Sequence, residues 1–404
     1  MAAAEVAGAR RVPAWRGGFG RLWAAAVVSR LGDALRTAAM PLLAASLTGD
    51  PLLIAAVTAC GHLPWLLFGL LGGAVADRVD QRRAMWAVDL VRGALMAGFA
   101  LAVALGQASI GLLIALAFAL TTLQTLFDNA ATALLPALVP AEALPGANAR
   151  LLTGQQIAGG FLAAPLVPAL LFAGAAVPYA ADAATYVLAA LLVASLRVAA
   201  PERPPREAGS SLRADMAKGL AVLWRDRALR GLCVATTLAN IGLGALIATL
   251  VLHVTDWLDA GAGGYAAAVT AYGAGSVMGG FLARWIAERT GWIRGVLLAG
   301  AVQTGALVVM GTVRAPWATI AALAVFGFMG MVWNVNQVSL TQQRSPDGML
   351  GRIGAAFRTL AVAGAPFGAL AGGAVAAAWG ANTPALLAAG LFTLAVASLA
   401  PLIN

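Results

Sequence analysis

Three ionisable residues interrupt the first long apolar segment of the chain, and they are the first candidates for chemistry. Arg30, Asp33 and Arg36 lie within residues 20–46. A charged side chain is costly inside a membrane, so such residues mark a functional site by default. In a helix that rises ~1.5 Å per residue, Asp33 lies ~16 Å below Leu22, near the middle of a ~30 Å hydrocarbon core.

The chemistry that this spacing favours is reversible protonation of a buried carboxylate. Burial stabilises the neutral form of Asp33, whereas a nearby guanidinium stabilises its charged form. Arg30, Asp33 and Thr37 share a helix face about 60° wide, so we predict that Asp33 exchanges a proton with a central cavity and that Arg30 adjusts its proton affinity. The alternative is a static Arg30–Asp33 pair that only neutralises two costly charges.

Further polar residues in later apolar segments are candidates for contact with a substrate. Amides inside a helix bundle either bind substrate or join helices through hydrogen bonds. For Arg358 the partner is either a carboxylate or catecholate of a substrate, or Asp128 or Asp347. The candidates are Gln155, Gln156, Asn334, Asn336 and Arg358.

Composition places these residues in an integral membrane protein. The 404 residues are 61% apolar and 11% charged, and their mean hydropathy is +0.85. Of the 26 Lys and Arg residues, 21 lie in the N-terminal tail and in alternate loops, and only Arg314 lies in the opposite loops. This asymmetry follows the positive-inside rule, so we expect both termini in the cytoplasm and interpret the net charge of +9 as topology rather than nucleic-acid binding.

The hydropathy pattern predicts an all-α protein with twelve transmembrane helices. A polar stretch rich in Pro and Arg separates the first six from the last six, and residues 212–226 are patterned as an interfacial helix. We expect an N-terminal cytoplasmic tail (1–18), a six-helix bundle (19–197), a cytoplasmic linker (198–230) and a second bundle (231–404). The expected spans are 20–46, 52–76, 84–105, 109–134, 149–173, 177–197, 231–257, 264–286, 293–313, 316–341, 353–379 and 383–402.

Short matches between the two halves indicate a duplicated six-plus-six arrangement. Gly72-Gly73 recurs as Gly279-Gly280, and Pro140 and Pro165 recur as Pro346 and Pro366, all at offsets between 201 and 207 residues. Parallel repeats of this kind place a substrate cavity between the halves, near the middle of the membrane.

The loop between the second and third expected spans carries a recognisable motif. Gly73-x-x-x-Asp77-Arg78-x-x-x-Arg82-Arg83 resembles the signature of the major facilitator superfamily at this position. Further segments are similar to the branch of that superfamily that holds siderophore and macrolide exporters, namely Ser29–Asp33, Asp89–Arg92, Phe127–Ala130 and Val332–Asn336.

The resemblance implies alternating access, with a cytoplasmic gate of charged residues that pair in one state and part in the other. The alternative for this cluster is a topology anchor that only holds charge in the cytoplasm. The gate residues would be Gly73, Asp77, Arg78, Arg82, Arg83, Asp89, Arg92 and Asp128.

The chain is therefore predicted to be a transporter and not an enzyme. It carries no nucleophile elbow, no metal-ligand motif and no phosphate-binding loop, so we expect no cofactor and no nucleotide-driven step. The predicted function is export of an amphipathic small molecule, such as a drug, macrolide or siderophore, by proton antiport across a bacterial cytoplasmic membrane, by a monomer. The alternatives are an uncoupled facilitator or importer of the same fold, and a membrane receptor or scaffold that does not transport.

Overall fold

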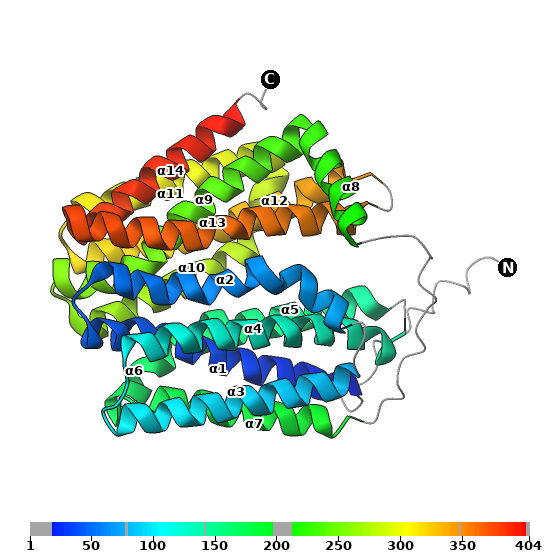
Figure 1. The fold of residues 1–404 in the computed structure, drawn as a ribbon. Coiled ribbons are helices and arrows are strands. Elements are labelled where there is room, and N and C mark those ends of the chain that lie inside the picture. Colours follow the sequence, from blue (N-terminus) through cyan, green and yellow to red (C-terminus); the bar gives the residue numbers. More distant parts are fainter. Residues whose placement is uncertain (1–17, 77–79, 141–142, 197–211, 347–348, 401–404) are drawn as a thin grey trace.

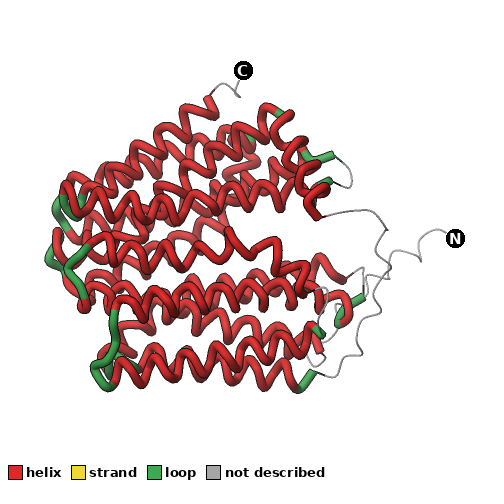
Figure 2. Tube along the Cα trace, viewed as in Figure 1, coloured by secondary structure: helices red, strands yellow, loops and turns green. Residues whose placement is uncertain are grey.

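The computed structural model describes residues 18–76, 80–140, 143–196, 212–346 and 349–400, and within these ranges the chain consists of helices joined by short loops and turns (Figures 1 and 2). The first half contains α1 (Gly18–Leu47), α2 (Pro51–Ala76), α3 (Gln81–Ala104), α4 (Ile110–Leu134), the 3-10 turn η1 (Leu135–Ala137), α5 (Leu144–Gln156), the π-helix η3 (Ile157–Leu162), α6 (Ala163–Ala173) and α7 (Val177–Ala194). The second half contains α8 (Leu212–Arg225), α9 (Arg227–Leu252), the π-helix η4 (His253–Trp257), α10 (Gly261–Thr290), α11 (Trp292–Thr312), α12 (Pro316–Arg344), α13 (Leu350–Trp379) and α14 (Thr383–Leu399).

These helices correspond to the twelve expected spans. Nine described helices are long and apolar enough to cross a membrane. The other three spans are α1, which carries the buried charges, the broken helix α5–η3–α6, and α14, which has 17 residues. The predicted all-α, twelve-helix architecture is confirmed.

The fifth span differs from the continuous helix expected at 149–173. It begins at Leu144 and changes from α to π geometry over Ile157–Leu162 before α6 resumes. Pro165 and Pro168 lie in α6, directly after the π segment, and have no backbone N–H to donate to the preceding turn. A π segment is the usual local accommodation and is frequent at functional sites.

The helices form two bundles, which Figure 1 shows as lower and upper layers. In the lower bundle α3 packs on α7, α2 on α4 and α1 on α7; in the upper bundle α10 packs on α12 and α9 on α13. Close approach of α9 and α13 depends on Gly364, Gly368 and Gly372, because a Cβ on Gly368 would overlap the Ile241 carbonyl. Small residues at such spacing let membrane helices gain van der Waals contact.

The bundles meet mainly where α2 lies against α13 and α9. Ala55 and Ala59 of α2 are buried with Ala248 and Ala369, and Gly373 lies beside the backbone of Pro51 at the start of α2. These contacts lie toward the end of the molecule away from the termini.

The end of the lower bundle that lies near the termini has a hydrophobic core of its own. Buried members include Phe19, Met85, Phe127 and Leu196, and no described residue of the upper bundle belongs to this core. Among the described residues, the contact between bundles is therefore concentrated at one end.

The predicted helix in the linker is present as α8. It packs on α13, where Gly219 lies against the Arg352 backbone, and it buries Leu223 while Leu220 and Trp224 are exposed. Its location at a membrane surface stays a prediction.

Candidate functional site

A cluster of charged and polar side chains lies inside the lower bundle, where α1, α3, α4 and α7 come together. Gly32 makes this possible, because a Cβ there would overlap Asp182 and Thr185 of α7. With α1 so close to α7, the next residue, Asp33, reaches Tyr186. The contributing side chains come from the interior of these helices, away from their ends.

Arg92 of α3 joins all four helices and has no exposed surface. Its guanidinium carbon lies 4.0 Å from the centre of the Tyr186 ring. Its Nη2 donates to Asp33 Oδ1 at 2.7 Å, to the Tyr186 hydroxyl at 2.7 Å and to Gln124 Oε1, and its Nη1 donates to Asp89 Oδ1 at 3.0 Å and to Ser29 Oγ at 3.3 Å.

Arg36 forms a second connection between α1 and α7. Its Nη2 lies 3.1 Å from Asp33 Oδ1, and its Nε lies 3.3 Å from Asp182 Oδ2. Asp33 Oδ1 therefore accepts hydrogen bonds from Arg36, Arg92 and Tyr186 at once, whereas Oδ2 of the same carboxylate has no hydrogen-bond partner among the described residues. Oδ2 of Asp89 is likewise without a partner.

The cluster extends along α4 to Asp128, which accepts a hydrogen bond from Gln124 Nε2 at 2.9 Å. Four carboxylates, those of Asp33, Asp89, Asp128 and Asp182, are thus connected to only two buried arginines. Arg30 lies at the edge and adds its attraction to Asp33 and Asp128. With three guanidinium groups for four carboxylates, the cluster becomes electrically neutral only when it also holds one proton.

Comparison with known proteins identifies the family. The family model of the Major Facilitator Superfamily matches residues 22–369. This chain belongs to the major facilitator superfamily. It is 28% identical over 379 residues to an uncharacterised transporter of the same type, y4rN, from Sinorhizobium fredii, covering 89% of this chain and 88% of the relative.

Other members of the superfamily are similar over part or all of the chain. Macrolide efflux protein A of Streptococcus pyogenes is 25% identical over 229 residues, or 55% of each protein. A mutant of the nucleoside transporter NupG has the same fold, with a TM-score of 0.79 over 96% of this chain and 100% of that one at 12% identity. A bacterial homologue of the iron transporter ferroportin in an inward-facing state gives a TM-score of 0.71 over 95% and 98% at 13% identity.

Within this superfamily member, the buried partner of Asp33 differs from the expected one. Arg30 is exposed and packs over η3, with its Nε 3.2 Å from where a Cβ on Gly159 would lie. The ion pairs of Asp33 are with Arg36 and Arg92 instead. The described residues contain no Arg30–Asp33 ion pair, and proton exchange at Asp33 stays a prediction.

Three residues assigned to the gate, Asp89, Arg92 and Asp128, lie in the cluster. Asp89 and Arg92, two and three turns into α3, pair with each other, and Arg92 also pairs with Asp33. At the loop before α3, Arg82 donates to the Ala194 carbonyl, and Arg83 forms an exposed pair with Asp80 at 3.5 Å. Gly73 lies near the end of α2, and Asp77 and Arg78 lie outside the described residues, so the gate stays a prediction.

The substrate candidates divide into exposed and buried residues. Asn334 and Arg358 are exposed, and Arg358 has no ion pair within the described ranges. Gln155 is half-buried, and Gln156 is the last residue of α5. Asn336 is fully buried, donates to the Val332 carbonyl at 2.7 Å and lies against Gly295 of α11. Asn336 therefore packs between α12 and α11, and its contact with a substrate stays a prediction.

Sequence reasoning assigned no role to four members of the cluster: Arg36, Gln124, Asp182 and Tyr186. Asp182 and Tyr186 lie one turn apart in an apolar segment, which is the same signal that singled out Asp33. Gln124 could not be identified from the sequence, because a single amide in a membrane helix is common.

Proposed function

We propose that this chain exports an amphipathic small molecule across a bacterial cytoplasmic membrane in exchange for protons. The observation that carries the proposal is the cluster of four carboxylates with two buried arginines, Arg36 and Arg92, and the exposed Arg30 at its edge. An uncompensated charge at membrane depth is costly, so the cluster favours a state that holds one proton.

The proton is held by the cluster as a unit, with Asp33 at its centre. Interacting carboxylates titrate together, and a change in one alters the charge that the others experience. The unpartnered Oδ2 atoms of Asp33 and Asp89 are the positions where a proton can be added without breaking an existing hydrogen bond. Release of the proton leaves the cluster with a net negative charge, which favours a rearrangement of α1 against α3 and α7.

Alternating access is supported by where the two bundles touch. If both termini lie in the cytoplasm, as the basic residues indicate, the contact of α2 with α13 closes the outer side. The exposed Arg30, Asn334 and Arg358 would then be reached from the cytoplasm and contact the cargo, with Gln155 beside them.

The cytoplasmic gate would form when Arg82 and Arg83, with Asp77 and Arg78, meet the opposite bundle. We propose that one monomer, with bundles at 19–197 and 231–404 and a linker at 198–230, completes the cycle.

The amphipathic cargo is inferred from the partial similarity to macrolide efflux protein A. Solved neighbours named as a nucleoside transporter, a POT family transporter and a fucose:proton symporter share the fold, and they leave the direction of transport open to experiment. No occupant other than cargo and protons is needed, so no cofactor is proposed.

The test is efflux of a fluorescent amphipathic dye by membrane vesicles with an imposed pH gradient. Wild type is expected to move dye only while the gradient lasts, and Asp33→Asn is expected to fall to the rate without a gradient. Asp80→Asn is the matched control, because Asp80 is exposed and caps α3 through the Arg83 N–H, a role that Asn also fills.

Each other outcome identifies an alternative. Dye flux by wild type that is independent of the pH gradient would identify a facilitator. Dye accumulation in the opposite direction would identify an importer. Gradient-driven efflux that persists in Asp33→Asn would overturn the assignment of coupling to Asp33. Absence of flux for a broad panel of dyes would favour a receptor or scaffold.

A further inference from the structure

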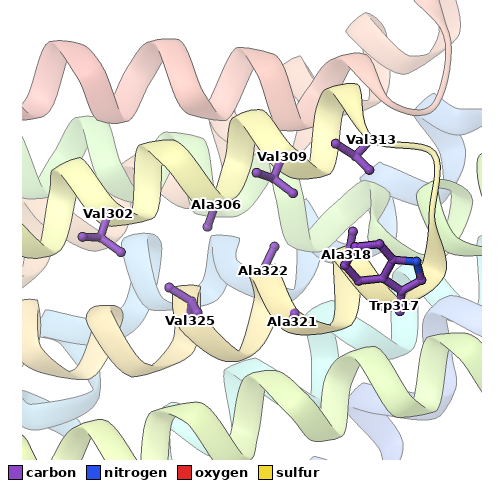
Figure 3. Close-up of a pocket in the computed structure, with 9 residues that line it drawn as sticks. All are labelled: Val302, Ala306, Val309, Val313, Trp317, Ala318, Ala321, Ala322 and Val325. Carbon is purple, nitrogen blue, oxygen red and sulfur yellow. The ribbon is translucent and has the colours of Figure 1, made fainter.

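A groove of about 380 Å³ lies on the surface of the upper bundle, between α11 and α12 (Figure 3). All nine lining residues are Val, Ala or Trp, and no charged, amide or hydroxyl side chain is among them: Val302, Ala306, Val309, Val313, Trp317, Ala318, Ala321, Ala322 and Val325. The groove belongs neither to the charged cluster nor to the contact between bundles.

The shape of the groove comes from small residues on its floor and larger ones at its rim. Ala306, Ala318 and Ala322 are at most 8% exposed, whereas Val309 and Val325 are 38% and 43% exposed. Figure 3 shows the valines of α11 pointing toward α12, with Trp317 at the end where the two helices are joined. Such a groove can hold a flexible apolar chain, but its lining side chains provide few hydrogen-bonding groups for a polar ligand.

The length of the groove matches one leaflet of a bilayer. From Val302 to Val313 the wall on α11 rises ~16 Å at ~1.5 Å per residue, and half of a ~30 Å hydrocarbon core is ~15 Å. The groove ends at Trp317, which is 74% exposed, and Trp is the residue enriched at membrane–water interfaces. The leaflet is the one at the end of the molecule away from the termini.

A positive charge lies at the interfacial end of the groove. Arg314 follows Val313 directly and is exposed, and its Nε donates to the Trp257 carbonyl at 2.7 Å. Its two Nη groups make no hydrogen bond within the described part of the chain. They are therefore free to receive an anion, and Arg314 is the one basic residue in the loops that the sequence places opposite the termini.

We propose that a zwitterionic phospholipid binds here, with one acyl chain in the groove and its phosphate on Arg314. Arginine recognises phosphate through charge-assisted hydrogen bonds. Asp256 and Asp259 flank the Trp257 carbonyl in the sequence and are exposed, so an amine in the headgroup is favoured over a second negative charge. The site is independent of the proposed transport function.

The test is native mass spectrometry of the full chain in detergent, with phosphatidylethanolamine added. We expect one lipid to bind more tightly than the rest, and Arg314→Gln to weaken that binding about tenfold, the scale of one charge-assisted hydrogen bond. Arg314→Lys should restore much of the affinity. Ala321→Trp, which fills the groove without touching Arg314, should weaken binding to a similar extent.

Two controls isolate the site. Arg294→Gln removes an exposed arginine at the other end of α11, and Ala301→Trp enlarges an exposed alanine of α11 outside the groove; neither should change binding. Affinity unchanged by both Arg314→Gln and Ala321→Trp would overturn the proposal. So would diacylglycerol, which lacks phosphate, binding as tightly as phosphatidylethanolamine, or phosphatidylglycerol binding more tightly.

Discussion

Arg92 is the residue on which the polar cluster depends, because its two Nη atoms contact groups on α1, α3, α4 and α7. A guanidinium suits this position, since its planar fork presents several donors in fixed directions. The guanidinium carbon of Arg92 lies 6.0 Å from the ring centre of Phe127 and 4.0 Å from that of Tyr186. Attraction between a cation and an aromatic face adds to the ion pairs when the site is dry.

Arg92→Met should destabilise the protein by about 3–5 kcal/mol, the usual result of leaving a buried partner charge without compensation. The measurement is thermal or denaturant unfolding in detergent. Arg83→Met is the control, because the Arg83 side chain is 80% exposed and its pair with Asp80 is open to solvent. We expect the free energy of unfolding of Arg83→Met to equal that of wild type. Equal stability of Arg92→Met and wild type would mean that the four helices are held by apolar packing alone.

The sequence located Asp33 but not its partners. Depth along an apolar segment can be counted, and that count predicted Asp33 near the middle of the hydrocarbon core; in the structure its side chain is buried. Arg30 and Arg36 are both three residues from Asp33, so spacing alone could not separate them. The rotation of α1 against α7, which is set by the Gly32 contact, decides that Arg36 faces inward.

At the scale of the helices, hydropathy predicted most spans well, because burial in lipid demands long apolar runs. The third span was expected at 84–105 and α3 covers Gln81–Ala104. The π segment of the fifth span was not predicted, because hydropathy reports apolar character and not the local pattern of backbone hydrogen bonds.

Close packing of α9 on α13 gives a prediction at this scale. Gly368→Ala should lower the free energy of unfolding by about 1–3 kcal/mol, the cost of overpacking, because the new methyl group meets the Ile241 carbonyl and both helices must separate. On the same helix, Gly354 has open space around it, and Gly354→Ala should be neutral or stabilise by up to about 1 kcal/mol through helix propensity. The free energies of unfolding of the two variants are measured in detergent. If Gly354→Ala is destabilised as much as Gly368→Ala, close helix contact is ruled out as the cause.

At the scale of the whole molecule, the contact between α2 and α13 is the place where the bundles must part for this end of the molecule to open. The Cα of Leu52 lies 3.2 Å from the position of a Cβ on Gly373. A disulfide between Leu52→Cys and Gly373→Cys should therefore stop transport when an oxidant forms it, and a reductant should restore transport. Dye flux before and after oxidation, with Cys60 and Cys233 replaced, provides the measurement.

A disulfide within one bundle is the control for that experiment. Met331 Cγ lies 3.6 Å from where a Cβ on Gly280 would be, so Gly280→Cys with Met331→Cys links α10 to α12. Transport should continue with this link in place. Full transport by the oxidised Leu52–Gly373 pair would show instead that this end need not open.

The buried charges lie almost entirely in one bundle. Within the described spans, Arg358 is the only charge in the middle of the upper bundle, whereas the lower bundle holds the whole cluster. A membrane potential does work on charge, about 2.3 kcal/mol for one elementary charge moved through 100 mV. If the proposed proton exchange takes place, the voltage across the membrane acts mainly on the lower bundle and most strongly when that bundle gains or loses a proton.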